Sequence, residues 1–119
     1  IDGLDANYNH INEIVVTNGT TAVATTNNYL RIHTATIVSN NTPNVGEITF
    51  RLASGTGTVV AHMTAGFGIT KLSQYTVPAG YTAFSVWGDF SILGSNSAEM
   101  QAYWRFYGGV FVGVGVGLS

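Results

Sequence analysis

Turn-forming residues recur about every 8 to 12 residues along this chain, and no stretch between them has the apolar spacing of an amphipathic helix. Residues 47–52 (Glu-Ile-Thr-Phe-Arg-Leu) instead alternate between polar and apolar side chains, as a half-buried strand does. The pattern predicts an all-β protein of eight or nine short antiparallel strands. We expect a β-sandwich of the jelly-roll kind, with an immunoglobulin-like sandwich or a small barrel as alternatives.

Two of these turns have clear residue signatures. Asn18-Gly19 predicts a hairpin turn of type I′ after a strand at 13–17, because both residues tolerate a positive φ. Pro78 and Gly80 predict an exposed corner, since proline has no N–H to give to a ladder and glycine accepts a positive φ.

Strands at 71–77 and 81–93 are expected on either side of that corner. Residues 1–12 are polar and rich in asparagine, and within them the sequence predicts a loop at 3–9 with one or two anchoring side chains.

Side-chain alternation also predicts the core. In strands at 47–52 and 99–107, the apolar residues at alternate positions should face inward. The predicted core residues in these two strands include Phe50, Leu52, Trp104 and Phe106.

Residues 110–118 form a strand with two unlike faces. One face carries valine and leucine and is expected in the core, and Phe111, Gly113, Gly115 and Gly117 make up the other face. An uncharged strand without proline would aggregate if it stayed exposed. The sequence therefore predicts that these four residues form an intersubunit interface. The alternative is that an aromatic ring of the same chain, such as Tyr103, fills the glycine face.

Length and charge limit what the protein can be. The chain has 119 residues, which suits a single domain spanning 1–119. Only 8% of the residues are charged, against about 25% in ordinary soluble proteins, and this composition favours an assembly over a free monomer. The four cationic residues are scattered, so we expect no binding to nucleic acid. No apolar stretch is long enough to span a membrane, and none is expected to do so.

The sequence offers no catalytic motif, and we expect no enzyme activity and no cofactor. The six carboxylates are far apart, and those in predicted strands should face solvent. His10, His33 and His62 are isolated, with His33 on the same face as Arg31 of a strand at 29–38. We expect surface or hydrogen-bonded histidines and no metal site. Several aromatic residues could form an exposed platform for sugars, but core packing is the expected role.

Three segments resemble a known family. Residues 3–9 (Gly-Leu-Asp-Ala-Asn-Tyr-Asn), the strand at 30–32 and residues 75–80 (Tyr-Thr-Val-Pro-Ala-Gly) are similar to small structural proteins of tailed bacteriophages, many of them marine. The similarity spans residues 3–118. Family members extend further at both ends, so the resemblance implies a sequence that is incomplete at both termini. The apolar Val-Gly repeat at 110–118 departs from the family, whose strand there is more charged.

The resemblance and the composition together predict a non-enzymatic virion protein, assembled in the host cytoplasm. Its expected role is to decorate or cement the capsid and so stabilise the head. It should act as a homo-oligomer, a trimer, bound to the major capsid protein or other virion proteins. The alternatives are a tail or fibre module that binds host-surface glycans through exposed aromatic rings, and a tail-associated glycan hydrolase.

Overall fold

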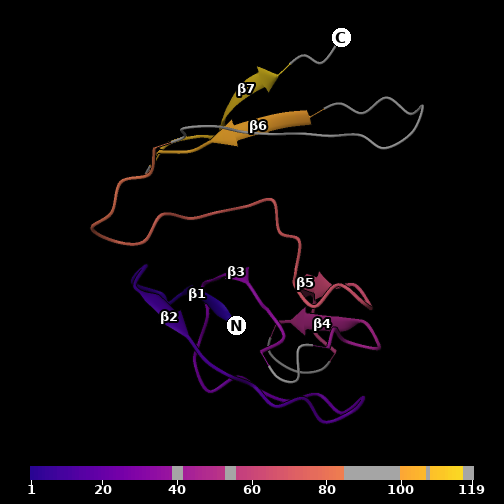
Figure 1. The fold of residues 1–119 in the computed structure, drawn as a ribbon. Coiled ribbons are helices and arrows are strands. Elements are labelled where there is room, and N and C mark those ends of the chain that lie inside the picture. The colour runs from indigo at the N-terminus through magenta and orange to yellow at the C-terminus, as the bar shows by residue number, and fades with distance from the viewer. Residues whose placement is uncertain (39–41, 53–55, 85–99, 107, 117–119) are drawn as a thin grey trace, which may run out of the picture. The chain divides into compact units, whose positions relative to one another are not determined.

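The structure, a computed structural model, describes residues 1–38, 42–52, 56–84, 100–106 and 108–116. The described residues form seven short strands, all paired antiparallel, and no helix (Figure 1). The prediction of an antiparallel all-β protein is therefore confirmed. The chain divides into two compact units, Ile1–Ala83 and Phe84–Ser119, while the single domain expected from the chain length stays a prediction.

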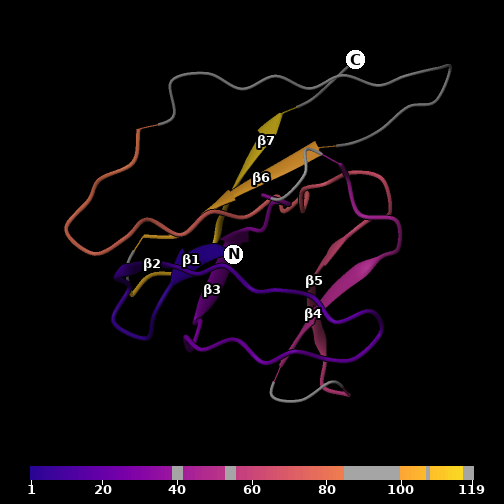
Figure 2. The same cartoon turned by 60° about the horizontal axis from the view of Figure 1, so that its bottom comes forward.

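A three-stranded sheet organises the first unit (Figures 1 and 2). Strand β1 (Asp2–Leu4) lies between β2 (His10–Asn12) and β3 (Arg31–Thr34). The β1–β2 ladder extends one pair further, because Ile1 and Glu13 exchange two backbone hydrogen bonds of 2.9 and 3.0 Å. The central strand therefore comes from the very start of the sequence.

The loop between β1 and β2 is closed by the carboxylate of Asp5. Its Oδ1 accepts hydrogen bonds from the backbone N–H groups of Asn7 (2.8 Å) and Asn9 (2.9 Å), and its Oδ2 accepts one from the Asn9 side chain (3.1 Å). Tyr8 adopts a positive φ of 63°, which completes the reversal. The loop predicted at 3–9 is confirmed for residues 5–9, where Asp5 is the anchoring side chain. Gly3 and Leu4 instead belong to β1.

Strands β1 and β3 approach each other closely at Gly3. A Cβ at this position would overlap the carbonyl oxygen of Arg31 and would lie 3.0 Å from Cδ1 of Tyr29. The next residue, Leu4, is fully buried, and its carbonyl accepts a 2.8 Å hydrogen bond from Leu30 N–H. Only glycine fits at the centre of this sheet.

A second sheet pairs β4 (Ile48–Arg51) with β5 (Val59–Met63), which confirms the strand predicted at 47–52. Thr70, in the segment after β5, is hydrogen-bonded to Ala35, the residue directly after β3. The Thr70 N–H donates to the Ala35 carbonyl, and the Thr70 hydroxyl accepts from the Ala35 N–H, both at 2.9 Å. Thr70 is buried, so these bonds satisfy polar groups that water does not reach.

The core of the described residues is small. Its buried apolar members are Leu4, Ala35, Ala61 and Met63. All four belong to the first unit, where they lie in β1, directly after β3, and in β5.

The larger core expected from alternation is not observed. Leu52, Trp104 and Phe106 are 45% to 81% exposed, so their prediction as core residues is wrong. Phe50 is half-buried and meets its prediction only in part. Alternation separates the two faces of a strand, but burial of a face requires a second layer packed against it.

The turn at residues 18–21 is confirmed, with a different geometry. Thr21 N–H donates to the Asn18 carbonyl at 2.9 Å. Asn18 is the first residue of the turn, and Gly19 and Thr20 are its two central residues. Of these two, only Gly19, with φ 55°, has a positive φ. That pattern belongs to a type II′ turn rather than the expected type I′. The chain at 13–17 forms no strand, so the strand predicted there is wrong.

The corner at residues 78–81 is also confirmed. Tyr81 N–H donates to the Pro78 carbonyl at 3.2 Å, and Gly80 has φ 78°, as a type II turn requires. Residues 71–77 and 81–84 form no strands, which contradicts the strands predicted beside the corner. The remainder of the strand predicted at 81–93 lies outside the described residues.

The second unit contains one described hairpin, β6 (Met100–Trp104) paired with β7 (Val112–Val116). Tyr103 lies opposite Gly113 in this ladder. Gly108 turns the chain with φ 71°, and Gly109 N–H donates to the Phe106 carbonyl at 2.9 Å. The strands expected at 99–107 and 110–118 are confirmed in β6 and β7, and of their described residues 105–106 and 110–111 lie outside the strands.

Replacing Gly3 with alanine should destabilise the first unit, because the added methyl overlaps backbone that cannot move aside without breaking the β1–β3 ladder. We expect Gly3→Ala to lower the free energy of unfolding by about 1–3 kcal/mol, measured by urea denaturation. The matched control is Gly46→Ala, where nothing lies within 4 Å of the added Cβ, and it should change stability by less than about 0.5 kcal/mol. Equal effects at both positions would contradict the close approach.

Candidate functional site

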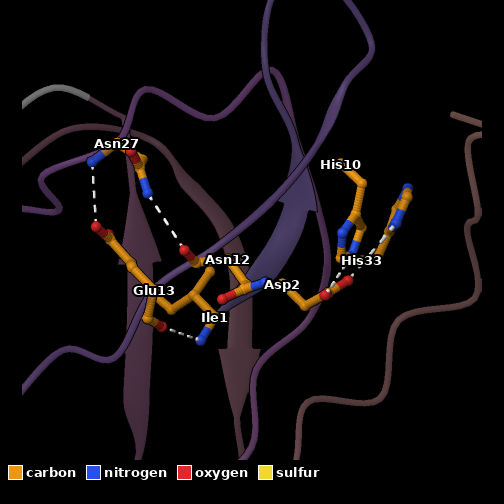
Figure 3. A network of polar contacts seen from close by, with 7 residues as sticks. All are labelled: Ile1, Asp2, His10, Asn12, Glu13, Asn27 and His33. Atoms are coloured by element: carbon orange, nitrogen blue, oxygen red, sulfur yellow. Dashed lines mark hydrogen bonds and ion pairs between the residues drawn. The ribbon is translucent and has the colours of Figure 1, made fainter. Parts of the chain in front are cut away.

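Two histidines flank the carboxylate of Asp2 (Figure 3). Nε2 of His10 lies 2.6 Å from Oδ2 of Asp2, and Nδ1 of His33 lies 4.0 Å from its Oδ1. The three residues come from the three strands of the first sheet, β2, β1 and β3. The pairing register places His10 opposite Leu4, so Asp2 and His10 are diagonal neighbours on one face.

His33 reaches Asp2 because of a β-bulge. Gly3 pairs with Ile32 and Asp2 pairs with Thr34, so the register shifts between these two pairs and His33 is the extra residue on β3. A bulge of this kind bends the strand and redirects a side chain. The side chain of His33 is only 7% exposed, and this burial separates it from the exposed Arg31, with which it was expected to share a face.

The chain at 75–76 covers His33. The ring of Tyr75 lies 4.5 Å from the His33 ring, centroid to centroid, with an angle of 31° between the planes. The backbone N–H of Thr76 donates to Nε2 of His33 at 3.2 Å. A ring nitrogen that accepts carries no proton, so the neutral ring holds its proton on Nδ1, the nitrogen that faces Asp2.

Burial lowers the pKa of His33 below its ordinary value of 6.5, because the charged ring loses its hydration. The carboxylate of Asp2 opposes this shift by favouring the charged ring, and His10 adds to the lowering by like-charge repulsion. The site therefore places a histidine whose pKa is lowered by burial beside the carboxylate of Asp2.

A hollow of about 310 Å³ adjoins this cluster at His10. Its other lining residues all come from the segment around the Pro78 corner: Tyr75, Val77, Pro78, Tyr81, Thr82 and Ala83. Tyr75 is 68% and Tyr81 75% exposed, so both rings are open to solvent. The hollow can receive the flat apolar face of a small ring, with the His10 imidazole as a polar partner.

The cluster can exchange a proton, and the hollow can stack and hydrogen-bond a ligand. In the ranges that the structure describes, no group of three or more histidine, aspartate and glutamate residues is arranged to hold a metal ion. The prediction of surface or hydrogen-bonded histidines is confirmed, since His10 and His33 are hydrogen-bonded and His62 is exposed on β5. The sequence did not predict that His10 and His33 flank one carboxylate.

The carboxylates have mainly structural contacts. Hydrogen bonds from Asn9 and Asn7 lower the pKa of Asp5. Glu13 is half-buried, and its Oε2 accepts from the N–H groups of Thr26 and Asn27, both at 3.1 Å (Figure 3 shows the Asn27 contact). Its expected exposure to solvent is therefore wrong. Glu47 is exposed, and two further carboxylates, Asp89 and Glu99, lie outside the described residues.

The predicted interface residues are placed in part. Phe111 is 66% exposed, and the Arg105 guanidinium lies 5.1 Å from its ring centre. At Gly113 the ring of Tyr103 lies 3.4 Å from where a Cβ would stand, so a ring of the same chain covers this glycine. Gly115 lies opposite Gln101 in the β6–β7 ladder, and Gly117 lies outside the described residues.

Sequence reasoning missed the meeting of Asp2, His10 and His33. Asp5, Asn7 and Asn9 carry the signal that could have revealed part of it, because aspartate and asparagine favour side-chain-stabilised turns. A turn centred on Asn7 would have paired the flanking residues and brought Asp2 near His10. Nothing local marks the bulge that brings His33 to the same carboxylate.

Comparisons with protein-family models, curated proteins and solved structures found no match for this chain. The portion of the chain that the structure describes has no helix long and apolar enough to cross a membrane.

The pKa of His33 provides a direct test of the cluster. Measured by NMR titration of the ring protons, it should lie below 6.5. Asp2→Asn should lower it further, because the substitution removes the charge that favours the protonated ring, and His10→Gln should raise it. His62→Gln, which removes an exposed histidine of β5, is the control and should leave the pKa of His33 unchanged. A higher pKa in Asp2→Asn would contradict this arrangement.

Proposed function

We propose that the protein is a non-enzymatic bacteriophage virion component that decorates or cements the capsid. It acts as a homotrimer, and the major capsid protein or another virion protein is its partner. The antiparallel strands form part of a jelly-roll sandwich that is completed in the assembled state. The proposal assigns no catalytic residue, metal or cofactor.

The observation that carries this proposal is the large amount of apolar surface left open in both units. The most exposed large apolar side chains include Ile14, Val16, Val38, Val45, Tyr81, Phe84, Phe106, Val110 and Phe111. Scattered single residues of this kind are ordinary, but contiguous ones favour association. Because only 8% of the residues are charged, there is little charge repulsion to prevent two copies of the chain from associating through such surfaces.

The β6–β7 hairpin is the best candidate for the contact surface. Val110, Phe111 and Val112 are consecutive and all exposed. A two-stranded hairpin is at best marginally stable in water on its own, so this one gains most from a covering layer. Tyr103 already covers Gly113, which makes Phe111 the stronger interface residue of the two.

Phe111→Asp should dissociate the oligomer, because a carboxylate in an apolar contact loses its hydration. In analytical ultracentrifugation we expect the unsubstituted chain at three times the 12.6 kDa of one chain, and the variant as a monomer with an unchanged β-type circular dichroism spectrum. Val45→Asp is the control, since Val45 is 98% exposed in the other unit, and it should remain trimeric.

A monomeric unsubstituted chain would count against the trimer. Location is tested separately by cryo-electron microscopy of the intact particle. Density on the capsid lattice supports decoration of the head, and density on the tail overturns it.

The hollow between His10 and the corner segment favours a second candidate function, a tail or fibre module that binds host-surface glycans. Tyr75 and Tyr81 present exposed rings at one hollow. Sugar rings have an apolar face that packs on such rings, and hydroxyl groups that hydrogen-bond to a partner such as the His10 imidazole.

Tyr81→Ala should abolish glycan binding if the hollow is a sugar site, because half of the aromatic surface is lost. The measurement is retention of the purified chain on an array of bacterial surface glycans. Phe67→Ala is the matched control, since Phe67 is also exposed but lies outside the lining of the hollow. Equal retention of both variants, or no retention of the unsubstituted chain, would reject this function.

A further inference from the structure

The segment 71–83 crosses the first unit without forming a strand. Two backbone N–H groups tie it to the three-stranded sheet and its hairpin loop. Thr76 N–H donates to Nε2 of His33 at 3.2 Å, and Ala79 N–H donates to the Tyr8 carbonyl at 2.8 Å. The first bond depends on a titratable acceptor, whereas the second does not.

We propose that His33 is a pH-operated latch for this segment. When Nε2 takes up a proton it becomes a donor and can no longer accept the Thr76 N–H. The two N–H groups then face each other, and residues 71–83 are released from the sheet around this point. Release moves the wall of the hollow, because Tyr75, Val77 and Pro78 lie on the released segment and His10 lies on the sheet.

The charges around the ring determine how the latch responds. The titratable groups that face His33 are the Asp2 carboxylate from β1, the His10 imidazole from β2 and the Tyr75 phenol from the segment itself. Asp2 attracts a protonated His33 but is already engaged by His10 at 2.6 Å. The ring of Tyr75 also attracts a cation. The attraction to Asp2 acts from the sheet, whereas the attraction to Tyr75 acts from the segment itself and opposes its release. Neither restores an acceptor for the Thr76 N–H.

The direction of the pH effect follows from the lowered pKa of His33 in the latched state. In the released state the ring is solvated and regains an ordinary pKa of about 6.5. At a pH between the lowered pKa of the latched state and the pKa of about 6.5 of the released state, the released state binds more protons than the latched state. The latch is therefore strongest above a pH of about 6.5 and weakens as the pH falls. One proton changes the latch equilibrium by at most about tenfold per pH unit.

Amide hydrogen exchange of the full chain, followed by NMR between pH 8 and pH 5, tests the latch. The quantity compared is the protection factor, which is corrected for the intrinsic pH dependence of exchange. For Thr76 we expect it to fall by up to about tenfold per pH unit below pH 6.5, in step with the ring shifts of His33. The Leu30 amide, bonded to the Leu4 carbonyl at 2.8 Å, reports the sheet and should stay constant.

Two variants separate the latch from general acid sensitivity. His33→Gln keeps an acceptor near the position of Nε2 but does not titrate, so protection at Thr76 should become independent of pH. His62→Gln removes an exposed histidine and should behave like the unsubstituted chain. If His33→Gln does not fold, Asp2→Asn replaces it, and the loss of protection should move to lower pH.

Constant protection at Thr76 through the titration of His33 would overturn the proposal. A parallel loss at Leu30 would also overturn it, because the acid response would then be unfolding of the whole sheet. The latch does not depend on either proposed function, and it can be present or absent whatever the protein binds.

Discussion

The close approach of β1 to β3 at Gly3 is the constraint on which the first unit depends. It lets a three-residue strand act as the centre of a sheet, with Leu4 fully buried beside it. The Asp5 turn brings β2 to the other edge, so β1 is paired on both sides. A short strand paired on one side only would gain little. Asp2 owes its position between two histidines to this pairing.

Polar contacts, rather than a large apolar core, join the remaining segments of the first unit. Thr70 connects the two sheets through buried hydrogen bonds, and His33 connects the corner segment to β3. Buried hydrogen bonds cost about 1–3 kcal/mol when one partner is lost, so such links can be decisive in a small domain. A link made through histidine also depends on pH, which distinguishes His33 from Thr70.

The exposed apolar surface and the hollow lead to two different views of function. Decoration of a capsid requires broad contact along a hairpin such as β6–β7, where Phe111 is exposed directly before β7. Glycan binding requires only the few rings around the hollow, Tyr75 and Tyr81 among them. The two surfaces belong to different units, so each is tested by a substitution in its own unit.

The sequence by itself determined the local features of this protein: its all-β character, the strand at β4, the turn at Gly19 and the corner at Gly80. These depend on side-chain alternation and on the φ that each residue tolerates, both of which are properties of neighbouring residues. Only the tertiary structure decided which strand is central, which apolar faces are covered, and that His33 meets Asp2. Those features depend on pairing between distant segments, and a one-residue bulge in that pairing redirects a side chain.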